Sequence, residues 1–389
     1  MSAPGRPKGE YRSAQHEGNP VNDRPFDAGS LAAAQAAFEA GRYQDAVAAA
    51  RLAGDSAAAL RLHCMAAYRI GELDECANAA RRQIEQSERE GGANDAARFD
   101  VLAVSVVAAA ELARFDQAIE HLQRMQAAAV RAGSLADFVR GRGTAANAFA
   151  LLGDPWAGQR LLSELAGMFQ AGSNDRRLEA TVRNNHASAC LQVARMARQG
   201  LDNAACEEAL DHASASLERT REIALTLQDT RVAAFADVHQ AELALLRGQA
   251  DQALALLDGA LERADGAGLW AHSRQLRLLE AEALMSGGDV AAAHAMLDAV
   301  AERLNDGHEL GARIRFHAQM QRVFTAEGDA ARALAQLERA RELAQYRQYR
   351  QARAQSRYLR VRLELEHMYR FRANTARAST SRPGALDTR

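Results

Sequence analysis

From residue 28 to residue 345, apolar positions recur with helical spacing and are interrupted by short turns. The first unit reads AAFEAGRYQDAVAAARLA, in which Gly41 would end one helix, while Ala46 and Ala50 lie four residues apart on the next. A turn glycine suits a helix C-terminus because it adopts the left-handed backbone conformation without strain. This pattern predicts two antiparallel helices joined by a tight turn.

Similar units follow along most of the chain, with turns expected at residues 41, 71, 113, 153, 200, 248, 288 and 328. The fifth unit carries extra residues before its turn at Gly200. No single helix pair can bury its own apolar face, so neighbouring pairs must stack. The sequence therefore predicts an all-α solenoid of about eight antiparallel helix pairs.

The distribution of prolines permits long helices, because Pro155 is the single proline between Phe26 and Arg382. The stretch LRVRLELE alternates like a strand, but Arg360 and Glu364 form a four-apart pair that favours a helix. We expect four segments: a disordered tail at 1–27, the solenoid at 28–345, a basic helix at 346–372 and a second disordered tail at 373–389.

The G-x-Y/F-x-x-A turn and the alanine-spaced second helix resemble the tetratricopeptide repeat (TPR) family. The intervals of about 40 residues exceed the usual 34, as in elongated repeats of bacterial sensor and regulator proteins. Armadillo or HEAT repeats, which are also near this length, are the alternative fold. The resemblance implies a right-handed superhelix that binds proteins or peptides in its concave groove. It extends to the sensor half of TPR-linked diguanylate cyclases, although no GGDEF motif follows here.

In this family the first helix of each pair lines the groove. The resemblance therefore nominates a polar, amphoteric set of partner-binding residues: Arg61, Tyr68, Arg140, Asn147, Thr181, Asn184, Ser188, Phe235, Glu242, Gln275, Glu282, Arg315 and Arg322. Asparagines could bond a peptide backbone and arginines could bond carboxylates. Each of these residues could also be an ordinary solvated helix position.

The last segment differs in charge, since the chain as a whole carries −2 but has twelve arginines and four acids from Arg341 onward. Its apolar seam is a candidate for homodimerisation through a coiled coil and includes Tyr358, Val361, Leu365 and Met368. A competing hypothesis is that Arg347, Arg350, Arg353, Arg357 and Arg360, interleaved with tyrosines, bind nucleic acid. We rank this second because no base-reading motif accompanies them.

Composition narrows the remaining chemistry. Cys64, Cys76, Cys190 and Cys206 lack zinc-site spacing, and the histidines form no HExxH motif. With no catalytic motif either, we expect a non-enzymatic protein without metal or cofactor.

The absence of an 18-residue apolar run and of a signal core predicts a cytoplasmic protein that avoids membranes. Arginine-rich composition, with Lys8 the one lysine, indicates a bacterial source. The expected function is a protein- or peptide-binding adaptor in bacterial signalling.

Overall fold

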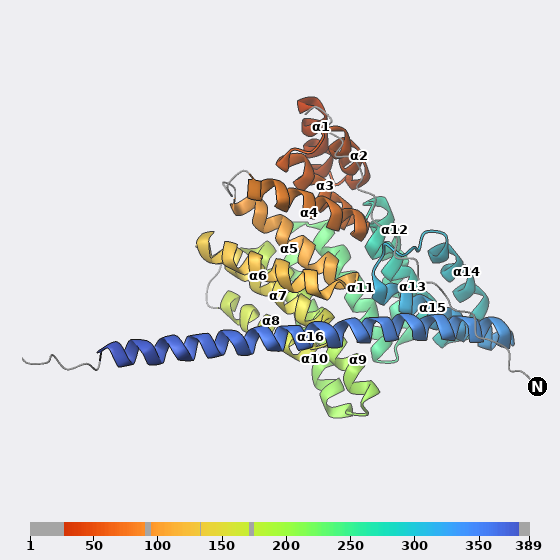
Figure 1. The fold of residues 1–389 in the computed structure, drawn as a ribbon. Helices are drawn as coiled ribbons and strands as arrows, with labels where there is room; N and C mark the ends of the chain where they lie inside the picture. Colours follow the sequence, from red (N-terminus) through yellow and green to blue (C-terminus); the bar gives the residue numbers. More distant parts are fainter. Residues whose placement is uncertain (1–26, 90–94, 133, 171–174, 381–389) are drawn as a thin grey trace, which may run out of the picture.

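The computed structural model describes residues 27–89, 95–132, 134–170 and 175–380 (Figure 1). These residues form sixteen α-helices: α1 (Ala28–Glu39), α2 (Tyr43–Leu52), α3 (Ala57–Ile70), α4 (Leu73–Arg89), α5 (Asp95–Glu111), α6 (Phe115–Ala132), α7 (Leu135–Leu151), α8 (Pro155–Gln170), α9 (Arg176–Gln199), α10 (Asn203–Leu227), α11 (Thr230–Leu246), α12 (Ala250–Gly266), α13 (Trp270–Gly287), α14 (Val290–Ala301), α15 (Leu310–Ala326) and α16 (Ala330–Thr380).

Each odd-numbered helix packs against the even-numbered helix that follows it, which gives eight pairs with α15 and α16 as the last. Each odd-numbered helix also contacts the next odd-numbered one, so these helices form one continuous layer of the solenoid. The predicted all-α solenoid of about eight antiparallel helix pairs with a long C-terminal helix is confirmed.

The turns within the pairs share one backbone conformation. Six of them place a glycine at positive φ, at residues 41, 71, 153, 248, 288 and 328, whereas the third uses Ala113 at φ 56°. The turn expected at Gly200 was wrong by one residue: Gly200 has φ −81° and Leu201 takes the left-handed position at φ 60°. The reason is that α9 continues one residue further, so Leu201 precedes the closing bond from Asp202 N to Ala197 O.

Small residues sit five positions after each turn residue, where the two helices of a pair meet. In all eight pairs they are buried: Ala46, Cys76, Ala118, Gly158, Cys206, Ala253, Ala293 and Ala333. At Gly158 a Cβ atom would lie only 2.7 Å from the carbonyl oxygen of Ala146 on α7. The repeated small residue therefore reflects the close approach of two backbones.

The solenoid curves until its two sides touch. Pairs α1–α8 lie on one side and α11–α15 on the other, with α9 and α10 at the lower centre of the view (Figure 1). Helix α3 contacts α13, and the buried cluster around Phe99 also contains Ala234 of α11 and Leu269 just before α13. We call α1–α8 the first arm and α11–α16 the second arm.

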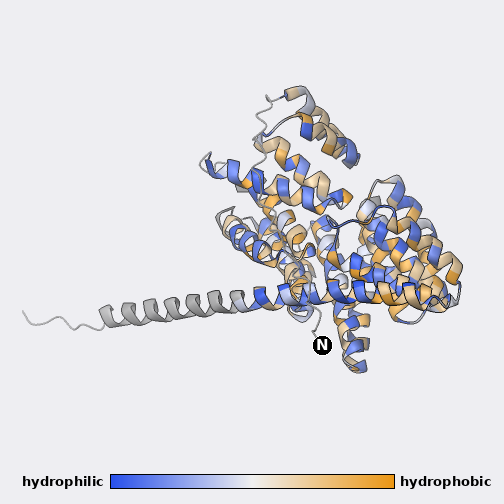
Figure 2. Cartoon of the chain, turned by 45° about the vertical axis from the view of Figure 1, so that its right-hand side comes forward, coloured by the Kyte–Doolittle hydropathy of each residue, from blue (hydrophilic) through white to orange (hydrophobic). Residues whose placement is uncertain are grey.

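Helix α16 crosses the lower part of the molecule in this view and extends from the second arm across the first (Figure 1). Its Leu343 and Ala354 are buried in a cluster with Ala113 and Phe115 of the first arm, although most of its described length is hydrophilic (Figure 2). The expected boundary at residues 345 and 346 falls inside this continuous helix. Of the disordered tails expected at 1–27 and 373–389, residues 1–26 and 381–389 lie outside the described residues, whereas residues 373–380 belong to α16.

Candidate functional site

All nominated partner-binding residues lie on odd-numbered helices: α3, α7, α9, α11, α13 and α15. The expected layer of first helices therefore carries them, but most of them contact other parts of the chain.

A charge network joins four helices of this layer. Glu242 of α11 forms an ion pair with Arg195 of α9, with 2.6 Å between Glu242 Oε1 and Arg195 Nε. The same oxygen lies 3.9 Å from Nη2 of Arg315 on α15. Burial would raise the pKa of Glu242, but Arg195 and Arg315 hold that pKa below its usual value. Burial and the facing Arg195 lower the pKa of Arg315, while Glu242 and Glu282 of α13 oppose that shift. Three nominated residues thus converge with Arg195, which the sequence pattern did not single out.

A second group lies beside this network and is largely uncharged. Phe235 stacks on His272 with ring centroids 4.4 Å apart, and Asn184 Oδ1 lies 3.1 Å from His239 Nδ1. Burial, reinforced by His239 and nearby arginines, lowers the pKa of His272 to about 3. Burial also lowers the pKa of His239, so both imidazoles are neutral near pH 7. The nominated asparagine and aromatic residue therefore share a polar but uncharged surface.

Arg61 and Arg140, nominated on separate helices, share one partner. Arg61 Nη2 lies 2.7 Å from Asp100 of α5, and Arg140 Nη1 lies 2.9 Å from the other carboxylate oxygen. The Arg140 guanidinium also lies 5.0 Å from the centre of the Phe99 ring. Asp100 therefore links α3, α5 and α7, and no sequence motif pointed to it.

Tyr68 lies where the two arms meet, a region that we call the arm junction. It comprises Tyr68 of α3, Gly71 in the turn after α3, Glu111 of α5, Arg274 of α13, Glu309 before α15, and Arg347 of α16. Arg274 and Glu309 form a buried ion pair. Burial, together with Glu309, raises the pKa of Glu111 to about 8 against the opposing Arg347 and Arg274. The sequence could not reveal this cluster because its members come from distant repeats.

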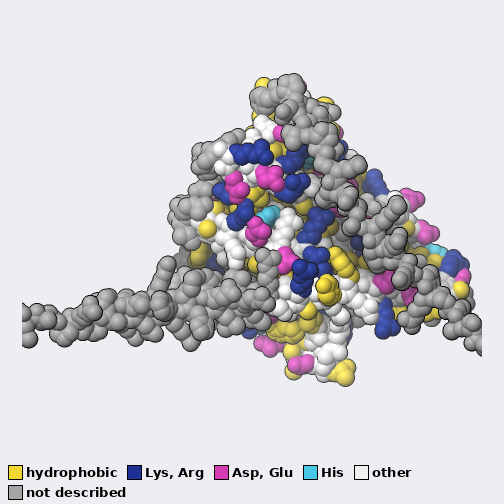
Figure 3. Space-filling view, viewed as in Figure 1, with side chains coloured by type: hydrophobic (Ala, Val, Ile, Leu, Met, Phe, Trp, Pro, Cys, Tyr) yellow, Lys and Arg dark blue, Asp and Glu magenta, His cyan; other side chains and the backbone are white. Residues whose placement is uncertain are grey.

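The remaining nominated residues do not join these groups. Asn147, Ser188 and Gln275 are partly buried, whereas Thr181 and Arg322 are exposed. Thr181 Oγ1 donates to the carbonyl oxygen of Arg177 at 2.9 Å within its own helix. On the face seen in Figure 3, basic and acidic side chains are interspersed. The visible surface therefore offers no field of a single sign.

The candidate dimer seam and the arginine-rich stretch both fall on α16. Helix α16 includes the positions of Tyr358, Val361, Leu365 and Met368, but their side chains lie outside the described residues. Arg347 faces Glu111 in the arm junction, while Arg350 lies over the Tyr346 ring at 5.8 Å. At least one arginine of the stretch therefore serves contacts within the chain.

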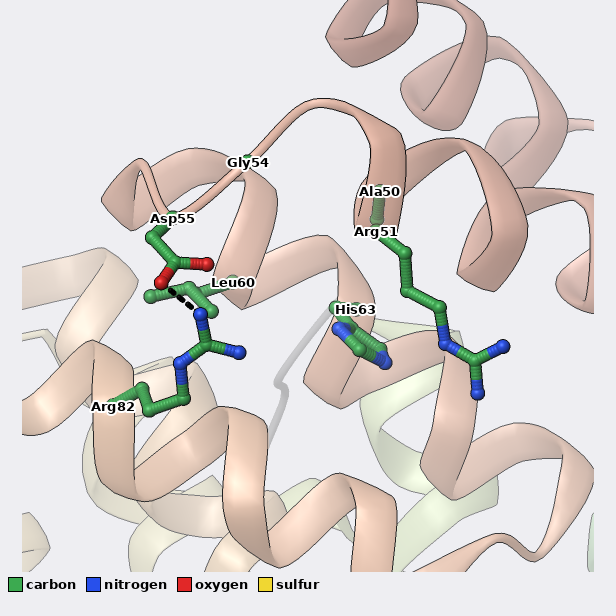
Figure 4. Close-up of a pocket in the computed structure, with 7 residues that line it drawn as sticks. All are labelled: Ala50, Arg51, Gly54, Asp55, Leu60, His63 and Arg82. Atoms are coloured by element: carbon green, nitrogen blue, oxygen red, sulfur yellow. Dashed lines mark ion pairs between the residues drawn. The ribbon is translucent and has the colours of Figure 1, made fainter. Parts of the chain in front are cut away.

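A cavity of about 160 Å³ lies between α2, α3 and α4 (Figure 4). Asp55 and Arg82 turn toward each other on one side of it as an ion pair, and Arg51 and His63 line the other side. Glu75 pairs with both of the latter, at 2.7 Å from Arg51 Nε and 2.6 Å from His63 Nε2. The charges balance within the chain, so this cavity has no excess charge to attract an ion.

Cys190, His186 and Ser216 form a cluster with the residue types of a nucleophilic site. His186 lies 2.8 Å from Ser216 Oγ through Nδ1 and 3.6 Å from Cys190 Sγ through Nε2. Burial raises the pKa of Cys190 to about 12 and lowers the pKa of His186 to about 4. An activated cysteine needs the opposite shifts, toward thiolate and imidazolium. We interpret this cluster as a structural contact between α9 and α10.

Two kinds of site are absent from the described part of the chain. No group of three or more His, Cys, Asp or Glu side chains is arranged there to hold a metal ion. None of the helices in those ranges combines the length and apolar character needed to cross a membrane.

Neither a protein-family sequence model nor a curated protein sequence matches this chain. Among solved structures, it is similar to a Rap protein complexed with Competence and Sporulation Factor, with a TM-score of 0.55, 11% identity, and 91% of this chain and 98% of that chain covered. A tetratricopeptide repeat protein from Parabacteroides merdae ATCC 43184 aligns with a TM-score of 0.42 and 11% identity over 78% of this chain and all of that one. The chain thus has the fold of a TPR-type helical solenoid.

Proposed function

We propose that the protein is a non-catalytic scaffold that binds a protein or peptide on the layer of odd-numbered helices, at α9, α11, α13 and α15, which we call the inner layer. One observation supports this most: Asn184, Phe235, Glu242 and Arg315 come from three helices. Arg195 joins Glu242 in the charge network that includes Arg315, while His239 contacts Asn184 and His272 stacks on Phe235 in the neighbouring group. The Rap protein with the similar fold was crystallised with Competence and Sporulation Factor. A partner bound on the same layer is consistent with that likeness.

The chemistry of this layer suits an extended peptide. Amide side chains such as Asn184 and Gln275 offer hydrogen bonds to a peptide backbone, and the exposed Arg322 offers a charge-assisted bond to a carboxylate. The neutral Phe235–His272 stack offers an apolar surface. Bacterial signalling in the cytoplasm, as an adaptor, is the setting that we propose.

The test is quantitative affinity capture from the native cytoplasm with purified wild-type and variant proteins. Gln275→Ala combined with Arg322→Ala alters the inner layer without removing a contact described above. Arg160→Ala, at an exposed position on α8, is the matched control. We expect a partner that the control retains and the double variant loses. Equal recovery by all three proteins would contradict the proposed surface.

Homodimerisation through α16 remains a separate proposal, resting on the seam at Tyr358, Val361, Leu365 and Met368. Sedimentation of the full chain should give twice the monomer mass, and Val361→Glu with Leu365→Glu should return it to the monomer. An unchanged mass in the variant would rule out this seam.

Nucleic-acid binding is the second candidate function, supported by one feature of α16. Tyr346 and Tyr349 are 46% and 62% exposed, and Arg350 and Arg353 lie on the same helix. Exposed aromatic rings and arginines can stack on bases and bind phosphates. Filter binding of single-stranded RNA across a salt series should weaken in Arg350→Gln with Arg353→Gln. No binding of the wild type at low salt would exclude this function.

A further inference from the structure

In every helix pair except α15–α16, a buried residue of the first helix, alanine in most pairs, lies twelve positions before the small residue of the second helix. The buried sets are Ala34 and Ala46, Val106 and Ala118, Ala146 and Gly158, Ala194 and Cys206, Ala241 and Ala253, and Ala281 and Ala293. In the α7–α8 pair, a Cβ atom at Gly158 would lie 2.7 Å from the carbonyl oxygen of Ala146, so the two backbones almost touch here. We call these positions the contact rung.

The α3–α4 pair carries a cysteine at both positions of its contact rung. Cys64 and Cys76 are each 0% exposed, and their sulfur atoms are 3.6 Å apart. A disulfide requires two Cα atoms within about 7 Å and Cβ atoms that face each other. A rung where two helix backbones approach closely is suited to that requirement, because rotation of the side chains can bring sulfurs already in contact to bonding distance.

We propose that Cys64 and Cys76 form a reversible intramolecular disulfide that locks α3 to α4. With hydrogen peroxide as the oxidant, one S–S bond forms and two S–H bonds break. The O–O bond of the peroxide also breaks, and the two electrons and two protons leave as part of two water molecules. Thiol reductants reverse the reaction by disulfide exchange.

Burial of the two thiols determines how fast the disulfide forms. The contact with Cys64, together with burial, raises the pKa of Cys76, so the reactive thiolate is scarce in the closed structure. Oxidation should therefore be slow and should depend on a small uncharged oxidant or on local opening of the helix pair. The same burial should make the completed disulfide slow to reduce.

The other two cysteines provide an internal comparison. Cys190 and Cys206 lie in a different buried cluster, and the near neighbour of Cys190 is the His186 ring. Cys206 shares its contact rung with Ala194, which has no sulfur. Sulfur contact, and not burial alone, should therefore select Cys64 and Cys76.

The disulfide would act on the first turn of α4, which holds several contacts. Next to Cys76, Glu75 binds His63 and Arg51 at the cavity, and Asp74 pairs with Arg114 in the turn after α5. Glu72, just before α4, lies 4.0 Å from His308 of the second arm. Oxidation would thus fix the part of the first arm that adjoins the arm junction.

The experiment treats the reduced full-length protein with hydrogen peroxide, then counts thiols after denaturation and analyses a tryptic digest without reductant. The thiol count should fall from four to two, and peptides 62–69 and 70–81 should appear linked. Peptides 184–195 and 199–219, which contain the other two cysteines, should remain reduced. Dithiothreitol should restore all four thiols.

Two controls separate the proposal from general oxidation. Cys190→Ser with Cys206→Ser should still form the linked peptides, whereas Cys64→Ala should keep its remaining three thiols. Oxidation of the urea-unfolded chain should lose the preference for Cys64 and Cys76. The proposal is overturned if the folded protein keeps four thiols after prolonged treatment, gains only oxygen atoms, or links its cysteines without preference.

Discussion

At the scale of single residues, backbone conformation places the sharpest demands on this protein. Leu201 occupies the left-handed region at φ 60°, where six other turns use glycine, and its side chain is 87% exposed. A side chain with a Cβ atom is strained there, and an exposed leucine recovers little of that cost by burial. Ala113 has the same conformation but is 1% exposed, so its methyl group contributes to packing.

We predict that Leu201→Gly stabilises the protein by about 1 kcal/mol, because it relieves the strain without removing a buried group. Ala113→Gly is the matched comparison. In Ala113→Gly the relief of backbone strain is offset by the loss of a buried methyl group worth about 0.8 kcal/mol. The free energy of unfolding should therefore hardly change. Urea unfolding of both variants measures these free energies. A loss of stability in Leu201→Gly would show that the leucine has a packing role.

Gly158 and Gly167 lie on the same helix but differ in their surroundings. A Cβ at Gly158 meets the Ala146 carbonyl at 2.7 Å, whereas nothing lies within 4 Å of one at Gly167. We predict that Gly158→Ala lowers the free energy of unfolding by about 1–3 kcal/mol through overpacking. Gly167→Ala should instead raise it by about 0.5–1 kcal/mol, because alanine is the better helix former. Similar values in urea unfolding would disprove the close backbone contact.

At the scale of elements, α16 is held to the first arm by hydrogen bonds as well as by apolar packing. Gln351 Nε2 donates to Leu151 O and Gln355 Nε2 donates to Leu152 O, both at 2.8 Å. These two carbonyls belong to the end of α7, where helical partners are missing. The two glutamines therefore cap one helix from the side of another and set the path of α16.

We predict that Gln351→Ala with Gln355→Ala loosens α16 while the solenoid stays folded. Each lost bond is worth about 1 kcal/mol, so trypsin should cleave after Arg350 and Arg353 about tenfold faster or more. Gln345→Ala with Gln348→Ala, on the exposed side of the same helix, should leave the rate unchanged. Equal cleavage of both variants would mean that apolar packing alone holds α16.

At the scale of the whole molecule, the arm junction couples closure of the solenoid to proton binding. Tyr68, Arg274, Glu309 and Arg347 surround Glu111, and its pKa in the folded protein is about 8 against an ordinary value of 4.5. The folded protein therefore holds this proton more tightly than the unfolded chain. The resulting stability is complete below the ordinary pKa and is lost as the pH rises through the folded pKa.

We predict that the free energy of unfolding falls by up to about 1.4 kcal/mol per pH unit between about pH 7 and pH 8 because of Glu111. Histidines such as the partly buried His272, whose pKa is lowered, act in the opposite direction and mainly at lower pH. Glu111→Gln should remove this slope, and the exposed Glu302→Gln should retain it. Parallel pH profiles for Glu111→Gln and the wild type would refute the assignment.

The sequence pattern located most turns because each repeats the same local requirement. Each turn has a residue at positive φ and a small residue five positions later. The spacing of Gly41 and Ala46 in the first turn therefore locates most of the later turns. The pattern placed the fifth turn at Gly200, but the residue with positive φ is the neighbouring Leu201. A glycine near the end of a helix is therefore not always the residue that takes the left-handed conformation. The odd-numbered helices were also predictable as one layer, since every repeat contributes the same face.

The candidate site was predictable only in part. Glu242 and Arg315 were nominated, but Arg195, Asp100 and Glu111 were missed. Their roles depend on how far the superhelix has turned by the time one repeat faces another, and this turn sums many small rotations between neighbouring repeats. A local sequence pattern defines each of these small rotations only poorly, so it cannot predict which residues of distant repeats come into contact.

The sequence alone therefore determined the helices, their pairing and the layer that faces inward, because these follow from contacts between neighbours in the chain. Only the tertiary structure decided that the two arms touch, that α16 binds the end of α7, and that the partly buried Glu111 lies near Glu309. These features join residues many repeats apart, and the accumulated curvature of the solenoid brings them together.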